Sequence, residues 1–566
     1  MLSNGRLLRA GLLALALWFT VVHSRISPWW PIVAGLAFAA LAIVHARVLG
    51  RIERARGAER VYLRGLERLR GLWAGTGRDG AQFLDEHPYV RDLDLFGRAS
   101  LFELLNIART EAGEAILAAW LRTGAPAEEV RARQTAVAEL RQNVDLREDL
   151  AVLAAETAIS RTGALAEWAL APPVGFARGV AYALAGCGAI AVALAGLAFE
   201  EWIAVRWLIF WLFAEAAIAL GWKRRFQQVL AGVDTPDRDL GLLSELLARI
   251  EVERLTSPRL AALQASLLTH GVPPSRRIAQ LRRMVSWLDS GRNQMFAPIA
   301  YALMLPQQLA VAIDGWHGAY GPAVNEWLRV VGELEALSAI ATYAYEHPAD
   351  PFPTLVEQGP LFEADALAHP LIPAESSVPN DVRLGGDHPH VIVVSGSNMS
   401  GKSTLLRSVG VNIVLALAGA PVRAATLRLS PLVPGATLRV EDSLEAGRSR
   451  FYAEILRIRT IVDAARGPVP LLFLLDEILH GTNSYDRRIG AEAIVRALAG
   501  CGAIGLVTTH DLALTELPSK LNVPAVNMHF EDRLENGRMV FDYRMRPGVV
   551  EHSNALALMR AIGLEV

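Results

Sequence analysis

The sequence of 566 residues predicts a C-terminal α/β domain after a long helical region, with one apolar hairpin at the N-terminus and a second inside the helical region. Three observations predict this arrangement. Beyond residue 350, short β-like runs alternate with helical stretches, which is typical of a parallel sheet with crossover helices. Apolar residues recur at helical spacing through most of residues 51–347. Finally, apolar runs of about 20 residues occur in two pairs, one before residue 50 and one between residues 176 and 225.

The composition excludes several classes of protein. Apolar residues make up 52% of the chain and charged residues 20%, with a mean hydropathy of +0.28, so the chain is not disordered. The formal charge is −2, and no global basic excess is available to hold nucleic acid non-specifically. The two cysteines, Cys187 and Cys501, lie far apart and support neither a disulfide framework nor a zinc cluster.

The first pair of apolar runs, residues 7–23 and 29–48, predicts a transmembrane hairpin within residues 1–50. Arginines flank the pair on both sides, so both ends are expected in the cytoplasm. A cleaved signal peptide is the alternative, because Arg6 and Arg9 followed by an apolar run resemble its first two regions. No clear small-x-small cleavage site follows, and the hairpin is favoured.

The second pair, residues 179–199 and 203–222, predicts another transmembrane hairpin within residues 176–225. Its basic flank at residues 223–225 again falls on the cytoplasmic side. Glu215 would then lie inside the membrane, where a carboxylate is costly. The alternative is a hairpin buried in a soluble protein. Together the two pairs predict a multi-pass membrane protein that contacts lipid and keeps its C-terminal domain in the cytoplasm.

The rest of the chain divides into helical and α/β parts. Residues 51–175 and 226–347 are expected to form the two halves of a helical core or lever, and residues 348–566 the α/β domain. Near the end, two β-like runs flank residues 535–537, which predicts an antiparallel hairpin. Prolines mark the boundary between the two parts: Pro348, Pro351, Pro353 and Pro360.

A phosphate-binding motif opens the α/β domain. Residues 396–403 match G-x-x-x-x-G-K-[ST] without departure, after a strand-like run and before a helical stretch. Backbone N–H groups of such a loop close around phosphate, Lys402 would reach the β- and γ-phosphates, and the Ser403 hydroxyl would bind Mg²⁺. The residues expected to contact the nucleotide are Gly396, Ser397, Asn398, Met399, Ser400, Gly401, Lys402, Ser403 and Thr404.

An acidic pair supplies the second half of the site. The apolar run at residues 471–475 ends in Asp476, which is expected to hold Mg²⁺, and Glu477, which is placed to act as general base on water. A third strand-like run ends in His510, which could sense the γ-phosphate, although a lone histidine there is more often structural. The pattern predicts a P-loop domain that hydrolyses ATP, with Lys402, Glu477 and His510 as its catalytic residues.

These residues resemble the MutS family. Asp476-Glu477 followed by residues 481–486 is similar to the family's D-E-x-x-x-G-T-x-x-x-D pattern, and residues 449–454 resemble its S-T-F-x-x-E stretch, with Arg450 in place of Thr. Residues 93–140 are similar to the opening of the MutS core domain. The resemblance implies an ABC-like ATPase that sandwiches two nucleotides between two subunits of a homodimer. It also implies that Ser449 approaches the partner's γ-phosphate; an ordinary N-cap serine is the alternative.

The resemblance further implies DNA binding related to mismatch repair or DNA damage sensing. The chain departs from the family, however, because no G-x-F-[YF]-E stretch of a mismatch-recognition domain occurs, and the second apolar hairpin stands about where the DNA clamp would be. Two functions therefore remain open: ATP-dependent DNA binding by a membrane-anchored MutS-like protein, or a membrane-tethered, ABC-like mechanochemical ATPase that does not read mismatches. A nucleotide-gated scaffold without a need for turnover is a third alternative.

Overall fold

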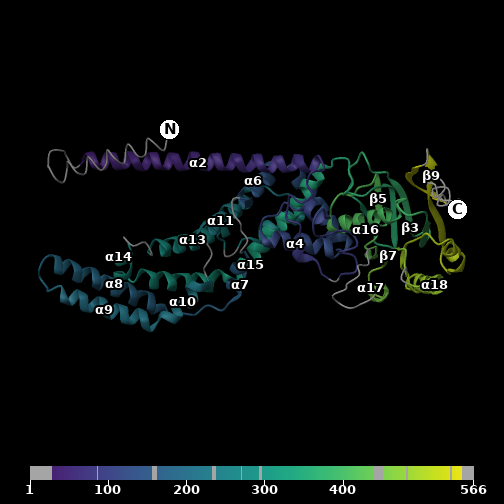
Figure 1. Cartoon of the computed structure of the whole chain (residues 1–566). Helices are drawn as coiled ribbons and strands as arrows, with labels where there is room; N and C mark the ends of the chain where they lie inside the picture. Colours follow the sequence, from purple (N-terminus) through teal and green to yellow (C-terminus); the bar gives the residue numbers. More distant parts are fainter. Residues whose placement is uncertain are drawn as a thin grey trace.

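The structure is a computed structural model that describes residues 29–85, 87–155, 162–232, 237–268, 271–291, 296–438, 450–479, 482–535 and 538–550. Figure 1 shows an elongated molecule with helices at one end and an α/β domain at the other. The helices of the first part are α2 (Trp29–Leu69), α3 (Leu101–Leu105), α4 (Glu111–Arg122), α5 (Ala127–Gln142), α6 (Val144–Ala155), α7 (Thr162–Leu170), α8 (Arg178–Phe199), α9 (Arg206–Gly221), α10 (Lys223–Gly232), α11 (Asp237–Val252), α12 (Pro258–Ser266), α13 (Pro274–Gly291), α14 (Ala297–Ala302) and α15 (Leu305–Glu346).

The 42-residue helix α15 is the spine of the helical part. Helices α4, α5, α7 and α13 pack along it, and its second half is buried almost throughout, with Trp327 fully enclosed. Apolar burial is the main source of this packing energy. Helix α4 contacts both α15 and the first helix of the α/β domain, so the two parts share one continuous hydrophobic core.

The α/β domain contains two sheets. The six-stranded sheet has the order β10-β9-β4-β8-β7-β6, and all neighbours are parallel except β9 and β10. The four-stranded sheet has the order β1-β5-β2-β3. The strands are β1 (Thr354–Leu355), β2 (Leu361–Leu367), β3 (Asn380–Gly385), β4 (Val391–Ser395), β5 (Thr426–Leu429), β6 (Val433–Thr437), β7 (Leu471–Asp476), β8 (Ile504–Thr509), β9 (Ala525–Glu535) and β10 (Arg538–Pro547).

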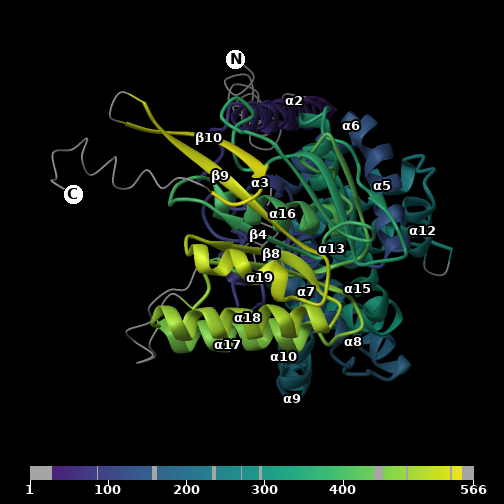
Figure 2. The same ribbon diagram turned by 90° about the vertical axis from the view of Figure 1, so that its right-hand side faces the viewer.

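Helices cover both faces of the six-stranded sheet, which explains why its central strands read as continuous apolar runs. Every residue of β4 and β8 is buried. Figure 2 shows α17 (Arg450–Ala464) and α18 (Ser484–Gly500) on one face and α16 (Lys402–Ala418) on the other. The short helix α19 (Leu517–Lys520) precedes β9. The predictions of a parallel sheet and of a late antiparallel hairpin are confirmed.

The second transmembrane hairpin is not confirmed. Within the described residues, one helical segment, Gly179–Phe199 in α8, is long and apolar enough to cross a membrane, and only 17% of its apolar window is buried. Helix α9 has 16 residues, or ~24 Å at ~1.5 Å per residue, which is less than the ~30 Å of a hydrocarbon core. The expected return span is therefore too short to cross by itself.

The first hairpin is not confirmed either. Residues 7–23 lie outside the described residues. Residues 29–48 do not form a separate segment, because α2 continues without a break from Trp29 to Leu69 and merges the expected span with the arginine-rich helix after it. Within the part of the chain that the structure describes, one candidate span stands where two hairpins were expected, and the multi-pass topology is not confirmed.

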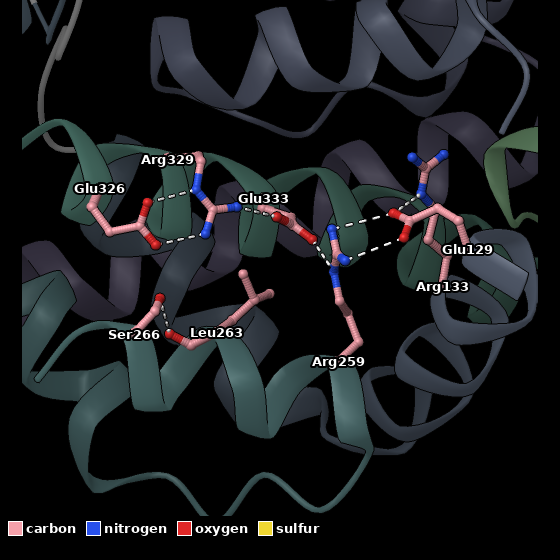
Figure 3. Close-up of polar contacts among 8 residues, drawn as sticks. All are labelled: Glu129, Arg133, Arg259, Leu263, Ser266, Glu326, Arg329 and Glu333. Atoms are coloured by element: carbon pink, nitrogen blue, oxygen red, sulfur yellow. Dashed lines mark hydrogen bonds and ion pairs between the residues drawn. The ribbon is translucent and has the colours of Figure 1, made fainter. Parts of the chain in front are cut away.

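A network of ion pairs joins α15, α12 and α5 in the helical part (Figure 3). Glu333 on α15 accepts from Arg329, at 2.9 Å, and from Arg259 on α12. Arg259 also pairs with Glu129 on α5, which in turn pairs with Arg133. Arg133 packs against Gly419 at the C-terminal end of α16, where an added Cβ would lie 2.6 Å from its own. The ion pairs and this packing contact therefore connect the helical part to the helix that follows the P-loop.

Replacing Glu333 with Gln should lower the free energy of unfolding by about 2 kcal/mol, because the partly buried Arg259 and the exposed Arg329 lose their shared carboxylate. The Glu333 side chain is 4% exposed. Glu326→Gln is the matched control. The Glu326 carboxylate pairs with Arg329 at the exposed end of the same ion-pair network, and its loss should cost less than about 1 kcal/mol. Urea denaturation of both variants measures the difference, and equal costs would contradict this reading of the network.

Candidate nucleotide-binding site

The P-loop connects β4 to α16. Met399 adopts a left-handed conformation (φ 69°), as does Gly401 (φ 107°), which serves as N-cap of α16. At Gly396 an added Cβ would lie 2.9 Å from Ser400 Oγ and 3.2 Å from the Phe530 carbonyl oxygen, so no larger residue fits there without a shift. The loop thus ends on the positive end of a helix dipole, which favours bound anions.

Lys402 begins α16 and is 4% exposed. Its ammonium group donates hydrogen bonds to the carbonyl oxygens of Gly396 (2.9 Å) and Ser397 (2.8 Å). It also lies 3.4 Å from Glu477 Oε1. The Lys402 ammonium group therefore lies between the P-loop and the acidic pair, although Lys402 and Glu477 are 75 residues apart in sequence.

The acidic pair ends β7, next to β8. Strand register places Asp476 opposite Thr508, and the Thr508 hydroxyl donates a hydrogen bond to Asp476 Oδ1 while it accepts one from the Glu477 amide at 3.1 Å. Glu477 has a left-handed backbone (φ 46°), which is uncommon for a non-glycine residue. Thr508 thus holds the carboxylate of Asp476 and the backbone of Glu477. The sequence analysis missed it, because only the strand register reveals the contact.

Two neighbouring side chains, Lys402 and His510, act on the charge of Glu477. Oε1 faces Lys402, and Oε2 lies 3.3 Å from His510 Nδ1. Burial raises the pKa of Glu477, but Lys402 and His510 outweigh burial, and the net pKa is lowered from its ordinary value. Glu477 is therefore ionised at neutral pH, as a general base must be, and would take up a proton only below the usual range of about 4.3. The structure brings Lys402, Glu477 and His510 together.

A cavity of 550 Å³ adjoins the loop, within the ~300–1,000 Å³ typical of small-molecule sites. The hydroxyl groups of Ser397 and Ser400 are buried and have no hydrogen-bond partner within the described part of the chain, so they are available to a ligand. Part of the wall comes from His369, whose pKa burial and Arg407 lower to about 4, so that its ring is neutral. The lining includes Asn398, Met399, Gly401, Lys402, Ser403, Thr404, Glu477, Asn380 and Tyr543.

The other predicted site residues differ in where they lie relative to the cavity. Ser403 lines the cavity, and Asp476 lies at the end of β7, so both could contribute oxygen ligands to Mg²⁺. Within the residues described, no group of three or more His, Cys, Asp or Glu side chains forms a metal cage. A bound Mg²⁺ would therefore need phosphate oxygens as well. Ser449 lies outside the described residues. Tyr543, which the sequence analysis did not single out, packs over Gly401, 3.2 Å from where its Cβ would be.

A strand, a glycine-bearing loop, a helix that begins at lysine and an acidic pair on a nearby parallel strand define a P-loop ATPase domain. Residues 392–565 match the family model for MutS domain V, which is an ABC-type ATPase domain that hydrolyses ATP. The match covers less than a third of the chain (174 of 566 residues). The predicted resemblance to MutS is therefore confirmed for this domain.

Curated relatives agree with this assignment. The chain is 35% identical over 246 residues to "DNA mismatch repair protein MutS" of Natronomonas pharaonis, an alignment that covers 43% of this chain and 28% of that protein. It is 32% identical over 297 residues (51% and 33%) to "DNA mismatch repair protein MutS 1" of Halobacterium salinarum. It is 30% identical over 269 residues (46% and 29%) to the MutS protein of Geobacillus thermodenitrificans. The aligned part thus spans about a third or less of each relative.

Proposed function

We propose that this chain is a MutS-like ATPase that uses the nucleotide site to drive ATP-dependent binding of DNA. The observation that carries the proposal is the cluster of Lys402, Glu477 and His510 beside the P-loop, in a domain that matches MutS domain V. The relatives named above are called DNA mismatch repair proteins. The α/β domain (residues 348–566) would be the motor, and the helices of residues 51–347 the lever.

Each site residue has a proposed role in hydrolysis. The loop amides and Lys402 bind the β- and γ-phosphates, and the Ser397 and Ser400 hydroxyls are free to donate to them. Ser403 and Asp476 hold Mg²⁺, which neutralises charge on the phosphates. Glu477 takes the proton from the attacking water, and Thr508 keeps it in place. His510 lies against Glu477 and, when protonated, can stabilise charge at the γ-phosphate.

Two copies of the chain are proposed to close around ATP. The exposed faces of α17 and α18 carry large apolar side chains, among them Tyr452, Ile455, Tyr485 and Ile489. Ser449, directly before α17, would then reach the partner's nucleotide. The ion pairs of Figure 3 and the contacts of α16 with α4 and α5 offer a path from the closing domain to the lever.

DNA binding by the purified chain, with and without ATP, tests this proposal. A protein that tracks phosphates loses affinity steeply as salt rises, so duplex DNA should bind at low salt, respond to ATP and be released at higher salt. Absence of duplex and heteroduplex binding at 50 mM salt would contradict the DNA function and leave the ATPase assignment untouched.

One observation favours a second function, a mechanochemical ATPase that acts at a lipid bilayer. The hairpin of α8 and α9 projects away from the ATPase domain, at the same end of the molecule as the N-terminal end of α2 (Figure 1). Its surface exposes aromatic side chains, with Phe199 86% and Phe213 72% exposed. A large exposed apolar patch marks a protein or membrane contact, and basic residues border it at Arg224 and Arg225.

Membrane partitioning separates the two functions. If α8 and α9 contact lipid, the double variant Phe210→Ser and Phe213→Ser should reduce recovery of the protein with liposomes several-fold, because two exposed rings lose their apolar contact with lipid. Tyr452→Ser, at an exposed aromatic of the ATPase domain, is the control and should leave recovery unchanged. Full recovery of wild-type protein from a salt-washed soluble fraction would contradict the bilayer function.

A further inference from the structure

A second cavity, of 270 Å³, lies where α2 meets α6 and α15, away from the P-loop. Its volume is below the ~300–1,000 Å³ of drug-sized sites, so it suits a small ligand. Most of its wall is apolar and comes from Val61, Leu66, Leu69, Ile107, Val144 and Ala151. The ring of Tyr345 on α15 completes the wall.

The polar part of this wall carries more cations than anions. Four arginines and two glutamates line it. The glutamates are already engaged: Glu346 receives two hydrogen bonds from Arg68, at 2.8 and 2.5 Å, and Glu148 accepts from the Tyr62 hydroxyl at 2.5 Å. Arg68 and Glu346 offset each other, and the remaining three arginines, Arg64, Arg109 and Arg147, outnumber the one remaining carboxylate, so the cavity carries an excess of positive charge.

Arg109 is partly buried and Arg147 is buried, and among the described residues neither guanidinium forms a direct ion pair with a carboxylate. Arg147 donates to neutral oxygens, those of Leu140, Arg141 and Thr342. The Arg109 guanidinium makes no hydrogen bond or ion pair with any residue that the structure describes. Burial, Arg64 and Arg78 lower its pKa to about 10 against the opposing effect of the Glu114 and Glu335 charges, so it is still charged at neutral pH. An arginine without a direct partner can pair with an anion that enters the cavity.

We propose that this cavity binds a small anionic amphiphile, whose single carboxylate or phosphate pairs with Arg109 while its apolar chain lies against the wall. The ligand would join α2 to α6 and α15. Since α15 is the spine of the lever, the site is placed to couple a ligand to the motion of that helix. The proposal rests on the cavity alone and stands whether or not the ATPase binds DNA.

Isothermal titration calorimetry of the full chain with decanoate and with decyl phosphate, each below its micelle concentration, tests the proposal. At least one should bind, and that ligand identifies the headgroup. Decanol has the apolar chain but no charge, and acetate has the charge but no long apolar chain. Each should therefore bind at least tenfold more weakly than the anionic amphiphile that binds. Arg109→Gln should weaken binding about tenfold or more. Arg70→Gln, at an exposed arginine at the end of α2 that does not line the cavity, should leave it unchanged.

Ala151→Phe provides a second, independent variant, because it fills the cavity from α6 and leaves every charge in place. It should abolish binding, and retained ATP affinity would show that the chain is folded. Failure of both anions to bind would overturn the proposal. So would equal affinity for decanol, or binding that neither Arg109→Gln nor Ala151→Phe weakens.

Discussion

Glu477→Gln should reduce steady-state ATP turnover by about 10²–10⁴-fold and leave ATP affinity within a fewfold of wild type. The amide keeps the shape of the side chain but cannot take a proton from water. In the structure Glu477 lies between Lys402 and His510, and its lowered pKa keeps it ionised at neutral pH. Its backbone amide donates a hydrogen bond to Thr508. Because Asp476 and Ser403 remain, Mg²⁺ binding should survive, and ATP-bound dimers should accumulate.

Phosphate release measures turnover of this variant, and size-exclusion chromatography with ATP measures the dimer. Glu516→Gln is the matched control, since Glu516 is an exposed carboxylate of the same domain that pairs only with Lys520 within the described residues. It should hydrolyse ATP at the wild-type rate. Unchanged turnover in Glu477→Gln would rule out Glu477 as the general base. It would instead favour a nucleotide-gated scaffold that does not need turnover.

Lys402→Ala should lower ATP affinity by at least about 100-fold, or about 3 kcal/mol, because charge-assisted contacts to two phosphates are lost. Filter binding with labelled ATP measures this loss directly. The Lys402 ammonium also holds two loop carbonyl groups, so thermal unfolding should be recorded to show that the variant is folded.

Lys520→Ala, at a partly exposed lysine that pairs with Glu492 and Glu516, is the control and should bind ATP normally. Normal nucleotide binding by folded Lys402→Ala would contradict the assignment of the P-loop.

The nucleotide site could be predicted from sequence because its chemistry lies in two contiguous stretches. The P-loop residues and the pair Asp476-Glu477 each follow an apolar strand, and parallel strands bring their carboxyl ends to one edge of the sheet. Thr508 and Tyr543 could not be found in this way. Their contacts depend on strand register and on the register shift between Phe541 and Met545 in β10, which spacing along the chain does not encode.

The helical part was harder to predict, because apolar runs do not reveal where a helix ends or what covers it. The sequence pattern predicts two separate segments, residues 29–48 and the arginine-rich stretch after them. Both stretches are helical, however, and the structure joins them in the single helix α2. The run at residues 203–222 begins with an irregular segment, so only 16 residues remain in α9. The cavity around Arg109 combines three helices from distant parts of the sequence and left no local signal.

The central claim is that the P-loop and the acidic pair form one nucleotide site. The structure of the Glu477→Gln variant with ATP and Mg²⁺ tests it most directly. The account predicts the γ-phosphate within hydrogen-bond distance of Lys402 Nζ and of the loop amides, with residue 477 facing it. A nucleotide bound elsewhere, or residue 477 turned away from the phosphates, would contradict the claim.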